Sequence, residues 1–132
     1  RVEKTLLIDC GVIQADAGTR TAAITGSWIA LRLACSRLLM EGHLTNDPIK
    51  GQVAAVSVGL KDGLALLDLD YSEDSTADVD LNVVMDSQKR FLELQGTAEG
   101  QPFSRNQLND LLDLAEPRIT QLHSAQLSVL QE

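Results

Sequence analysis

Hydrophobic positions along the chain change their period once, and this change separates two sets of predicted elements. Residues 5–13 are almost continuously apolar, which is typical of a strand covered on both faces. Residues 21–41 carry apolar side chains at helical spacing, and Gly42 follows as a stop signal. From residue 52 onward the period becomes two, and strands are predicted at 52–60, 64–71, 79–85 and 90–97.

Turn signals join these four strands into two hairpins. Asp62-Gly63 favours a tight turn in the first hairpin. Ser87-Gln88 is the predicted tip of the second hairpin. Residues 72–78 separate the hairpins, and they are polar and short enough for a loop or one or two helical turns.

A long helix is predicted after the hairpins. Ser104 and Gln107 have the spacing of a capping box. Phe103 and Leu108 flank that cap and are placed to pack as a hydrophobic staple. Pro117 lies inside the apolar pattern and is expected to kink this helix or to split it in two. Two hairpins and a long C-terminal helix together predict an α+β fold.

Composition and charge restrict the partners. The chain has 132 residues, 44% of them hydrophobic, and no apolar run reaches membrane-spanning length, so no membrane partner is expected. Cys10 and Cys35 lie in apolar patterns, which favours buried thiols in a reducing compartment such as the cytoplasm. The net charge of −8 argues against independent affinity for RNA. The chain could still bind RNA if basic residues came from the missing half of the protein or from a neighbouring subunit. A metal held by the carboxylates would have the same effect.

Residues 14–26 carry the clearest candidate chemistry. Gly18, Thr19 and Arg20 form a predicted small-residue turn between the first strand and the first helix. A helix N-terminus favours negative charge, and the guanidinium of Arg20 suits phosphate oxygens. The sequence therefore indicates an anion site, and an ordinary strand-to-helix connection with an exposed arginine is the alternative.

The second hairpin collects carboxylates on one face. A tip at Ser87-Gln88 sets Asp80 opposite Gln95, Asn82 opposite Glu93, and Asp78 opposite Thr97. The other face is predicted to join the core through Val79, Leu81, Val83, Leu92 and Leu94. Gathered carboxylates can hold Mg²⁺ or Mn²⁺, although a solvated outer face is the alternative.

Asp74 lies six residues before Asp80 in the connection to this hairpin, and these two acids are the main candidates for metal binding or acid–base chemistry. Asp78, Glu93 and Glu99 are weaker candidates. Neither His43 nor His123 has metal-ligand spacing, so both are interpreted as surface or satisfied structural groups. Trp28 falls on the buried stripe of its helix and is interpreted as core.

The run from Ala17 to Gly26 resembles the phosphate-binding segment of the ribonuclease PH family, in which Gly-Gly-Thr-Arg-Thr-Ala-Ser-Ile-Thr-Gly is typical. Ala17 replaces a glycine of that pattern, and Gly11 stands where the family often has aspartate. The similarity continues through residues 50–59, 73–85 and 94–100. Family members are longer, and the chain resembles only their C-terminal half.

The resemblance implies a fold and an activity. Residues 1–45 would be the end of a ribosomal protein S5 domain 2-like domain, and residues 46–132 would be the second ribonuclease PH domain, with the boundary in the turn-rich linker. The implied enzyme is a phosphorolytic 3′-to-5′ exoribonuclease that trims tRNA precursors. It uses inorganic phosphate and releases nucleoside diphosphates.

By the same resemblance, Gly18, Thr19 and Arg20 would bind phosphate, and Asp74 and Asp80 would be catalytic and hold a divalent metal, with magnesium expected. The implied partners are the 3′ end of tRNA, the N-terminal half of the same protein, and further copies in a hexameric ring. A non-catalytic ring component that binds RNA or only assembles is the alternative, as is an inactive half-chain. The presence of Arg20 and both acids favours the enzyme.

Overall fold

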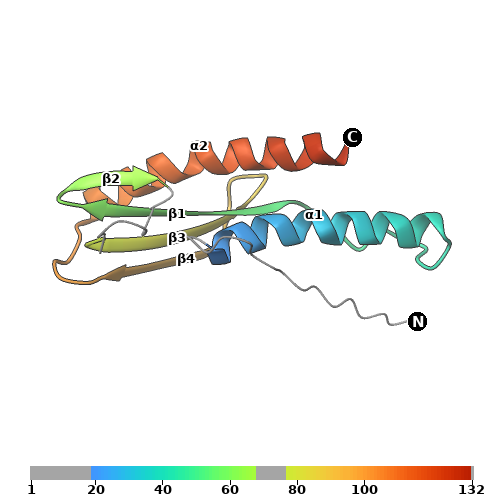
Figure 1. The fold of residues 1–132 in the computed structure, drawn as a ribbon, viewed down its shortest axis with the longest axis horizontal. Helices are drawn as coiled ribbons and strands as arrows, with labels where there is room; N and C mark the ends of the chain where they lie inside the picture. The colour runs from blue at the N-terminus through green and yellow to red at the C-terminus, as the bar shows by residue number, and fades with distance from the viewer. Residues whose placement is uncertain (1–18, 68–76, 132) are drawn as a thin grey trace.

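The computed structural model of the chain describes residues 19–67 and 77–131. In chain order the elements are α1 (Thr19–Met40), β1 (Val53–Lys61), β2 (Leu64–Leu67), β3 (Val79–Asp86), β4 (Phe91–Ala98) and α2 (Arg105–Leu130). These elements confirm the predicted α+β class (Figure 1). The strand predicted at residues 5–13 and most of the polar connection at 72–78 lie outside the described residues.

The four strands form one antiparallel sheet in the order β2-β1-β3-β4. The first hairpin has the predicted tight turn, because Asp62 and Gly63 both have positive φ, at 51° and 78°. Two consecutive residues with positive φ are what a two-residue turn of the I′ type requires. The turn at Asp62-Gly63 therefore fixes the register between β1 and β2.

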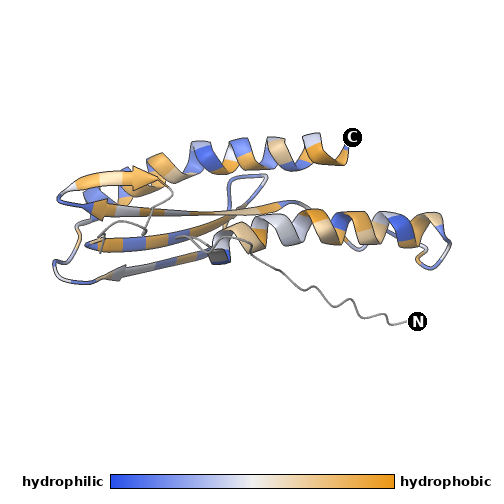
Figure 2. Cartoon of the chain, in the orientation of Figure 1, coloured by the Kyte–Doolittle hydropathy of each residue, from blue (hydrophilic) through white to orange (hydrophobic). Residues whose placement is uncertain are grey.

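Helix α2 covers one face of the sheet, where it packs against β1, β2 and β3 (Figure 1). Its start is fixed by the predicted capping box: the Gln107 N–H donates to Ser104 Oγ at 3.1 Å, and the Ser104 N–H donates to Gln107 Oε1 at 2.8 Å. Figure 2 shows hydrophobic and hydrophilic residues alternating along β3, so only one of its faces belongs to the core. The core consists of Ala54, Val56, Val58, Leu60, Val79, Leu81, Val83, Met85, Leu111, Ala115 and Ile119.

The register of the second hairpin differs from the prediction. Asp80 lies opposite Thr97, Asn82 opposite Gln95, and Val84 opposite Glu93. The turn is longer than expected, because the Asp86 N–H donates to the Arg90 carbonyl at 2.9 Å and leaves three residues in the loop. A bulge after Val84 adds a second one-residue shift. Together the shifts amount to two residues, which preserves the predicted faces because side chains alternate with a period of two.

Two apolar residues of β4 are not in the core as predicted. Leu92 is 59% exposed and Leu94 is 43% exposed. Strand β4 is the edge of the described sheet, and α2 does not reach it. The prediction was wrong because alternation along a strand shows which residues share a face, whereas the length and position of the covering helix decide which of them are buried.

Helix α2 runs as one helix through Pro117, so it is not split. A proline inside a helix removes one N–H donor, which leaves the carbonyl four residues earlier without its usual partner. That carbonyl belongs to Asp113, and both Asp113 and Pro117 are exposed to solvent. Water can therefore satisfy the freed carbonyl, and the packing of the apolar face holds the two halves of the helix in line.

Helix α1 lies along the first half of β1, near Ala55, where the described residues of β2 do not pair with β1. Within the described residues, β2 pairs with Val58–Lys61. At Ala55 the backbone N–H donates to Thr25 Oγ1 at 3.0 Å, and the same hydroxyl donates to the Ala55 carbonyl at 3.4 Å. A side chain of α1 thus replaces a neighbouring strand and satisfies the polar groups of this edge.

Gln126 joins α1, β1 and α2 in one place. Its side chain is 1% exposed, and its Nε2 donates to the carbonyls of Thr25 at 3.0 Å and Val53 at 2.9 Å. Its Oε1 accepts a hydrogen bond from Gln52 Nε2 at 3.1 Å. A buried amide with its donors and acceptor all paired holds two helices and a strand in a single arrangement.

Gln126→Leu is expected to lower the free energy of unfolding by about 2–4 kcal/mol, because it removes the donors to two carbonyls and one of the two acceptors of Gln52 Nε2, which also donates to the His123 carbonyl. Chemical denaturation followed by circular dichroism measures this change. Gln121→Leu, at an exposed position of the same helix, is the control and is expected to change stability by less than about 0.5 kcal/mol. Equal effects of the two substitutions would contradict the role given to Gln126.

Candidate phosphate-binding and catalytic site

The polar face of the sheet meets the N-terminal turns of α1. The Thr21 and Ser57 hydroxyls lie 3.3 Å apart, and Ser57 Oγ donates to Asn82 Oδ1 at 2.7 Å. Thr21 and Ser57 are both buried. This chain of hydrogen bonds fixes the start of α1 against β1 and β3 on the face opposite α2.

Asp80 lies on this polar face, two residues from Asn82 along β3. A spacing of two residues in a strand corresponds to about 7 Å. Its chain neighbours Val79 and Leu81 point into the core on the other face. The carboxylate of Asp80 is therefore placed beside the polar network and outside the apolar core, as the alternation predicted.

Arg20 forms a two-point ion pair with Glu93 of β4. Its Nη2 donates to Glu93 Oε1 at 2.8 Å, and its Nη1 lies 2.7 Å from Glu93 Oε2. The side chain of Arg20 is 53% exposed and that of Glu93 is 35% exposed, so solvent reaches the pair. The hydrogen bond from Arg20 holds the pKa of Glu93 below its ordinary value, which keeps the carboxylate ionised at neutral pH.

The helix begins earlier than predicted, so Thr19 and Arg20 belong to its first turn and not to the turn before it. The first N–H groups of any helix have no acceptor within the helix and attract anions. Arg20 therefore carries its guanidinium at the end of the helix that favours negative charge. Gly18 and Asp74 lie outside the described residues, and of Thr19 only the backbone is described.

Two of the weaker candidates for metal binding or acid–base chemistry, Asp78 and Glu99, lie away from the Thr21–Ser57–Asn82 hydrogen bonds. Asp78 Oδ2 accepts a hydrogen bond from the Asp62 N–H at 2.9 Å, so this side chain supports the first hairpin turn. Glu99 is exposed just beyond the end of β4. Trp28 is buried and donates from Nε1 to the Gly51 carbonyl at 2.7 Å, which confirms its interpretation as core.

Residues 19–67 and 77–131 contain no group of three or more histidine, cysteine, aspartate or glutamate side chains that could hold a metal ion. On the polar face, Glu93 is engaged with Arg20, and Asn82 Oδ1 already accepts a hydrogen bond from Ser57. Mg²⁺ is commonly held by one or two carboxylates together with water and substrate phosphates. Asp80 can supply one such ligand, and the described residues do not complete a metal centre by themselves.

Sequence reasoning did not find the partner of Arg20. Glu93 is 73 positions away in the chain, and its only sequence signal was its place on the polar face of the second hairpin. The interpretation of His123 as a surface or satisfied structural group was wrong, because His123 is buried and its Nε2 has no hydrogen-bond partner in the described structure. A histidine on the apolar side of a helix was the one available signal.

Comparisons with known proteins agree with the expected family. The 3′ exoribonuclease family, domain 2, matches residues 51–118. The chain is 68% identical over 130 residues to a protein named Ribonuclease PH from Prochlorococcus marinus (strain MIT 9313), covering 98% of this chain and 53% of that protein. It is 58% identical over 129 residues to Ribonuclease PH from Synechococcus elongatus (strain ATCC 33912 / PCC 7942 / FACHB-805), covering 98% of this chain and 54% of that protein.

The chain therefore belongs to the 3′ exoribonuclease family, as its resemblance predicted. It spans about half the length of the curated relatives it matches. The family match falls within the predicted second domain, whereas the predicted boundary near residue 45 stays a prediction. Neither helix in the part of the chain that the structure describes is long and apolar enough to cross a membrane.

Arg20→Ala is expected to weaken the binding of inorganic phosphate by about tenfold or more, because it removes a charged donor at the helix N-terminus. Isothermal titration calorimetry with phosphate measures this affinity. Arg37→Ala is the matched control, since Arg37 is an exposed arginine of the same helix that pairs with Glu41. An unchanged affinity in Arg20→Ala would remove this residue from the site.

Glu93→Gln is expected to raise phosphate affinity severalfold, because Glu93 occupies the guanidinium that phosphate is expected to bind. The same titration measures it, and Asp110→Asn, an exposed acid of α2, controls for the change in net charge. A loss of affinity in Glu93→Gln would show that Glu93 positions Arg20 for phosphate and does not compete with it.

Proposed function

We propose that this chain is part of a phosphorolytic 3′-to-5′ exoribonuclease of the ribonuclease PH type, which trims the 3′ end of tRNA precursors. Inorganic phosphate is the attacking group, and each cycle releases a nucleoside diphosphate. The observation that carries this proposal is that the Thr21–Ser57–Asn82 hydrogen bonds hold the start of α1, where Arg20 lies, against the polar face of β3 that carries Asp80.

In this proposal the first turn of α1 seats the attacking phosphate. The helix N-terminus supplies backbone N–H donors, and Arg20 supplies two donors that suit two phosphate oxygens. The carboxylate of Glu93 engages these two donors with a similar two-oxygen geometry. Phosphate would take the place of Glu93 on the guanidinium.

The reaction joins one oxygen of phosphate to the terminal phosphorus of the RNA and breaks the bond from that phosphorus to the 3′ oxygen of the preceding nucleotide. The new phosphoanhydride leaves with the terminal nucleoside as a diphosphate, and the 3′ oxygen takes up a proton. Positioning two anions in line and neutralising their charge account for most of the rate in such transfers. The Thr21–Ser57–Asn82 network supports this positioning because it fixes α1 relative to β3.

Asp80 is assigned to the reacting end of the site, together with Asp74. A carboxylate there can hold the proton that the 3′ oxygen receives, or it can serve as one ligand of a divalent cation such as Mg²⁺. When bound, such a cation would neutralise charge on the phosphoryl oxygens.

We also propose that the chain acts beside further copies in a hexameric ring, together with the N-terminal half of the same protein. The support for a neighbour comes from β4, which is the edge strand of the described part of the sheet and leaves Phe91, Leu92 and Leu94 exposed. An uncovered sheet edge with apolar side chains commonly pairs with another chain.

Asp80→Asn is expected to lower turnover by about a hundredfold or more in the full-length protein that carries these residues, while its melting temperature stays unchanged. The residue lies outside the apolar core, so the substitution opens no cavity. Phosphate-dependent release of nucleoside diphosphate from an RNA with a 3′ tail measures the rate, and thermal unfolding measures stability. Asp113→Asn, an exposed residue of α2, is the control. An Asp80→Asn protein that retains its turnover would refute the assignment.

A further inference from the structure

Asn82 of β3 lies midway between the two ends of the candidate site. The guanidinium of Arg20 contacts Glu93, which is opposite Val84 in the register of the sheet. Asn82 precedes Val84 by two residues, and Asp80 precedes Asn82 by two more. Two residues of a strand span about 7 Å and bring side chains to the same face. Asn82 therefore separates the place expected for phosphate from the acid.

The carboxamide of Asn82 is held in one orientation. Ser57 Oγ donates to Asn82 Oδ1 at 2.7 Å, and the Thr21 hydroxyl lies 3.3 Å from Ser57 Oγ. Thr21 and Ser57 are buried, whereas Asn82 is partly exposed. The oxygen and nitrogen of a carboxamide point in different directions from one carbon. Because the oxygen is engaged on the buried side, Nδ2 is directed toward the accessible part of the polar face.

Nδ2 of Asn82 is a donor that the fold leaves unused. Within residues 19–67 and 77–131, the one hydrogen bond of the Asn82 side chain is that with Ser57, and it takes the oxygen. The nitrogen carries two N–H groups that can donate to the oxygen of a ligand. Gln95, which lies opposite Asn82 on β4, is exposed, so a ligand can reach this part of the face from solvent.

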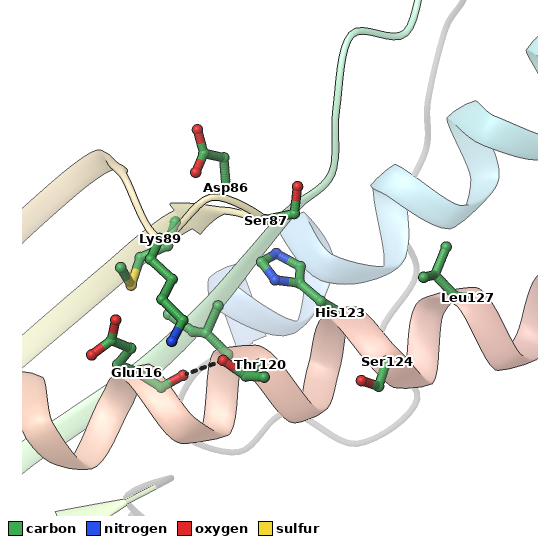
Figure 3. Close-up of a pocket in the computed structure, with 10 residues that line it drawn as sticks. Asp86, Ser87, Lys89, Glu116, Thr120, His123, Ser124 and Leu127 are labelled. Atoms are coloured by element: carbon green, nitrogen blue, oxygen red, sulfur yellow. Dashed lines mark hydrogen bonds between the residues drawn. The ribbon is translucent and has the colours of Figure 1, made fainter.

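The chain neighbours of Asn82 belong to the other face of the sheet. Leu81 and Val83 are in the core beneath α2. On that side a cavity of about 140 Å³ lies between α2 and the turn that joins β3 to β4, beside His123 (Figure 3). The sheet separates Asn82 from this cavity, and its amide therefore serves the face that carries Asp80.

We propose that Nδ2 of Asn82 donates a hydrogen bond to a non-bridging oxygen of the phosphoryl group that is transferred. This assignment rests on the proposed phosphorolysis, in which Arg20 seats the attacking phosphate and Asp80 lies at the end of the 3′ oxygen. The phosphoryl group passes between these two ends, where Asn82 lies. The amide forms no bond to phosphorus and transfers no proton. Its N–H groups stabilise the charge on the phosphoryl oxygens during the transfer.

Two substitutions, made in the full-length protein that carries these residues, separate this role from a structural one. Asn82→Asp keeps an oxygen that can accept from Ser57 but replaces Nδ2 with a second oxygen, whereas Asn82→Ala removes both groups. Each is expected to lower turnover by about a hundredfold, which is the usual effect of losing one such donor. The melting temperature of Asn82→Asp is expected to stay unchanged. Asn109→Asp, the same change at an exposed position of α2, is the control and is expected to keep full turnover.

Release of nucleoside diphosphate at saturating phosphate, from an RNA with a 3′ tail, measures turnover. Full turnover in Asn82→Asp would show that Asn82 only holds Ser57 and α1 in place, and it would overturn the proposal. Full turnover in Asn82→Ala would overturn it as well. An unsubstituted protein without phosphorolysis would instead refute the proposed function, so the two failures are distinguishable.

An RNA with a phosphorothioate at its terminal linkage tests the contact itself. Sulfur accepts hydrogen bonds weakly, so sulfur at the contacted oxygen is expected to slow the unsubstituted protein about tenfold more than it slows Asn82→Ala. Only one of the two configurations at phosphorus places sulfur at this oxygen, and the other configuration is the internal control. Equal slowing of the two proteins by both configurations would overturn the proposal.

Discussion

The buried side chain of Gln126 is the contact on which the arrangement of this chain depends. It donates to a carbonyl of α1 and a carbonyl of β1 while it belongs to α2, so three elements meet at one amide. An amide buried to this extent is stable only when its polar atoms are paired. The same contact sets where α1 crosses the sheet, and therefore where the positive end of that helix lies.

The candidate site follows from this placement. Since α1 is held against β1, its first turn reaches over the polar face, where Thr21 meets Ser57 and Arg20 meets Glu93. The two faces of the sheet thus differ in what covers them, because α2 closes the apolar core on one side and α1 brings a helix N-terminus and a guanidinium to the other. A single sheet separates the proposed phosphate site from the cavity beside His123.

The ion pair of Arg20 with Glu93 bears on how an acidic chain would bind the phosphate that we propose. A net charge of −8 disfavours phosphate in general, but the acceptor of Arg20 is a carboxylate with the same two-oxygen geometry as phosphate. In the proposed site, phosphate would therefore replace one local partner and would not need a basic surface. The pair is exposed to solvent, so this exchange requires no opening of the core.

The sequence by itself determined the features that depend on neighbouring residues. Apolar residues at helical spacing predicted the helices, and apolar residues at every second position predicted the strands. Asp62-Gly63 predicted a hairpin turn and Ser104 predicted a helix start, because backbone preferences and capping act over a few positions. The face of Asp80 was also predictable, since alternation survives a shift of two residues. Only the tertiary structure decided the register, the exposure of Leu92, and the meeting of Arg20 with Glu93. These depend on loop length, a bulge, and the reach of a helix distant in sequence, and no local pattern records such distances.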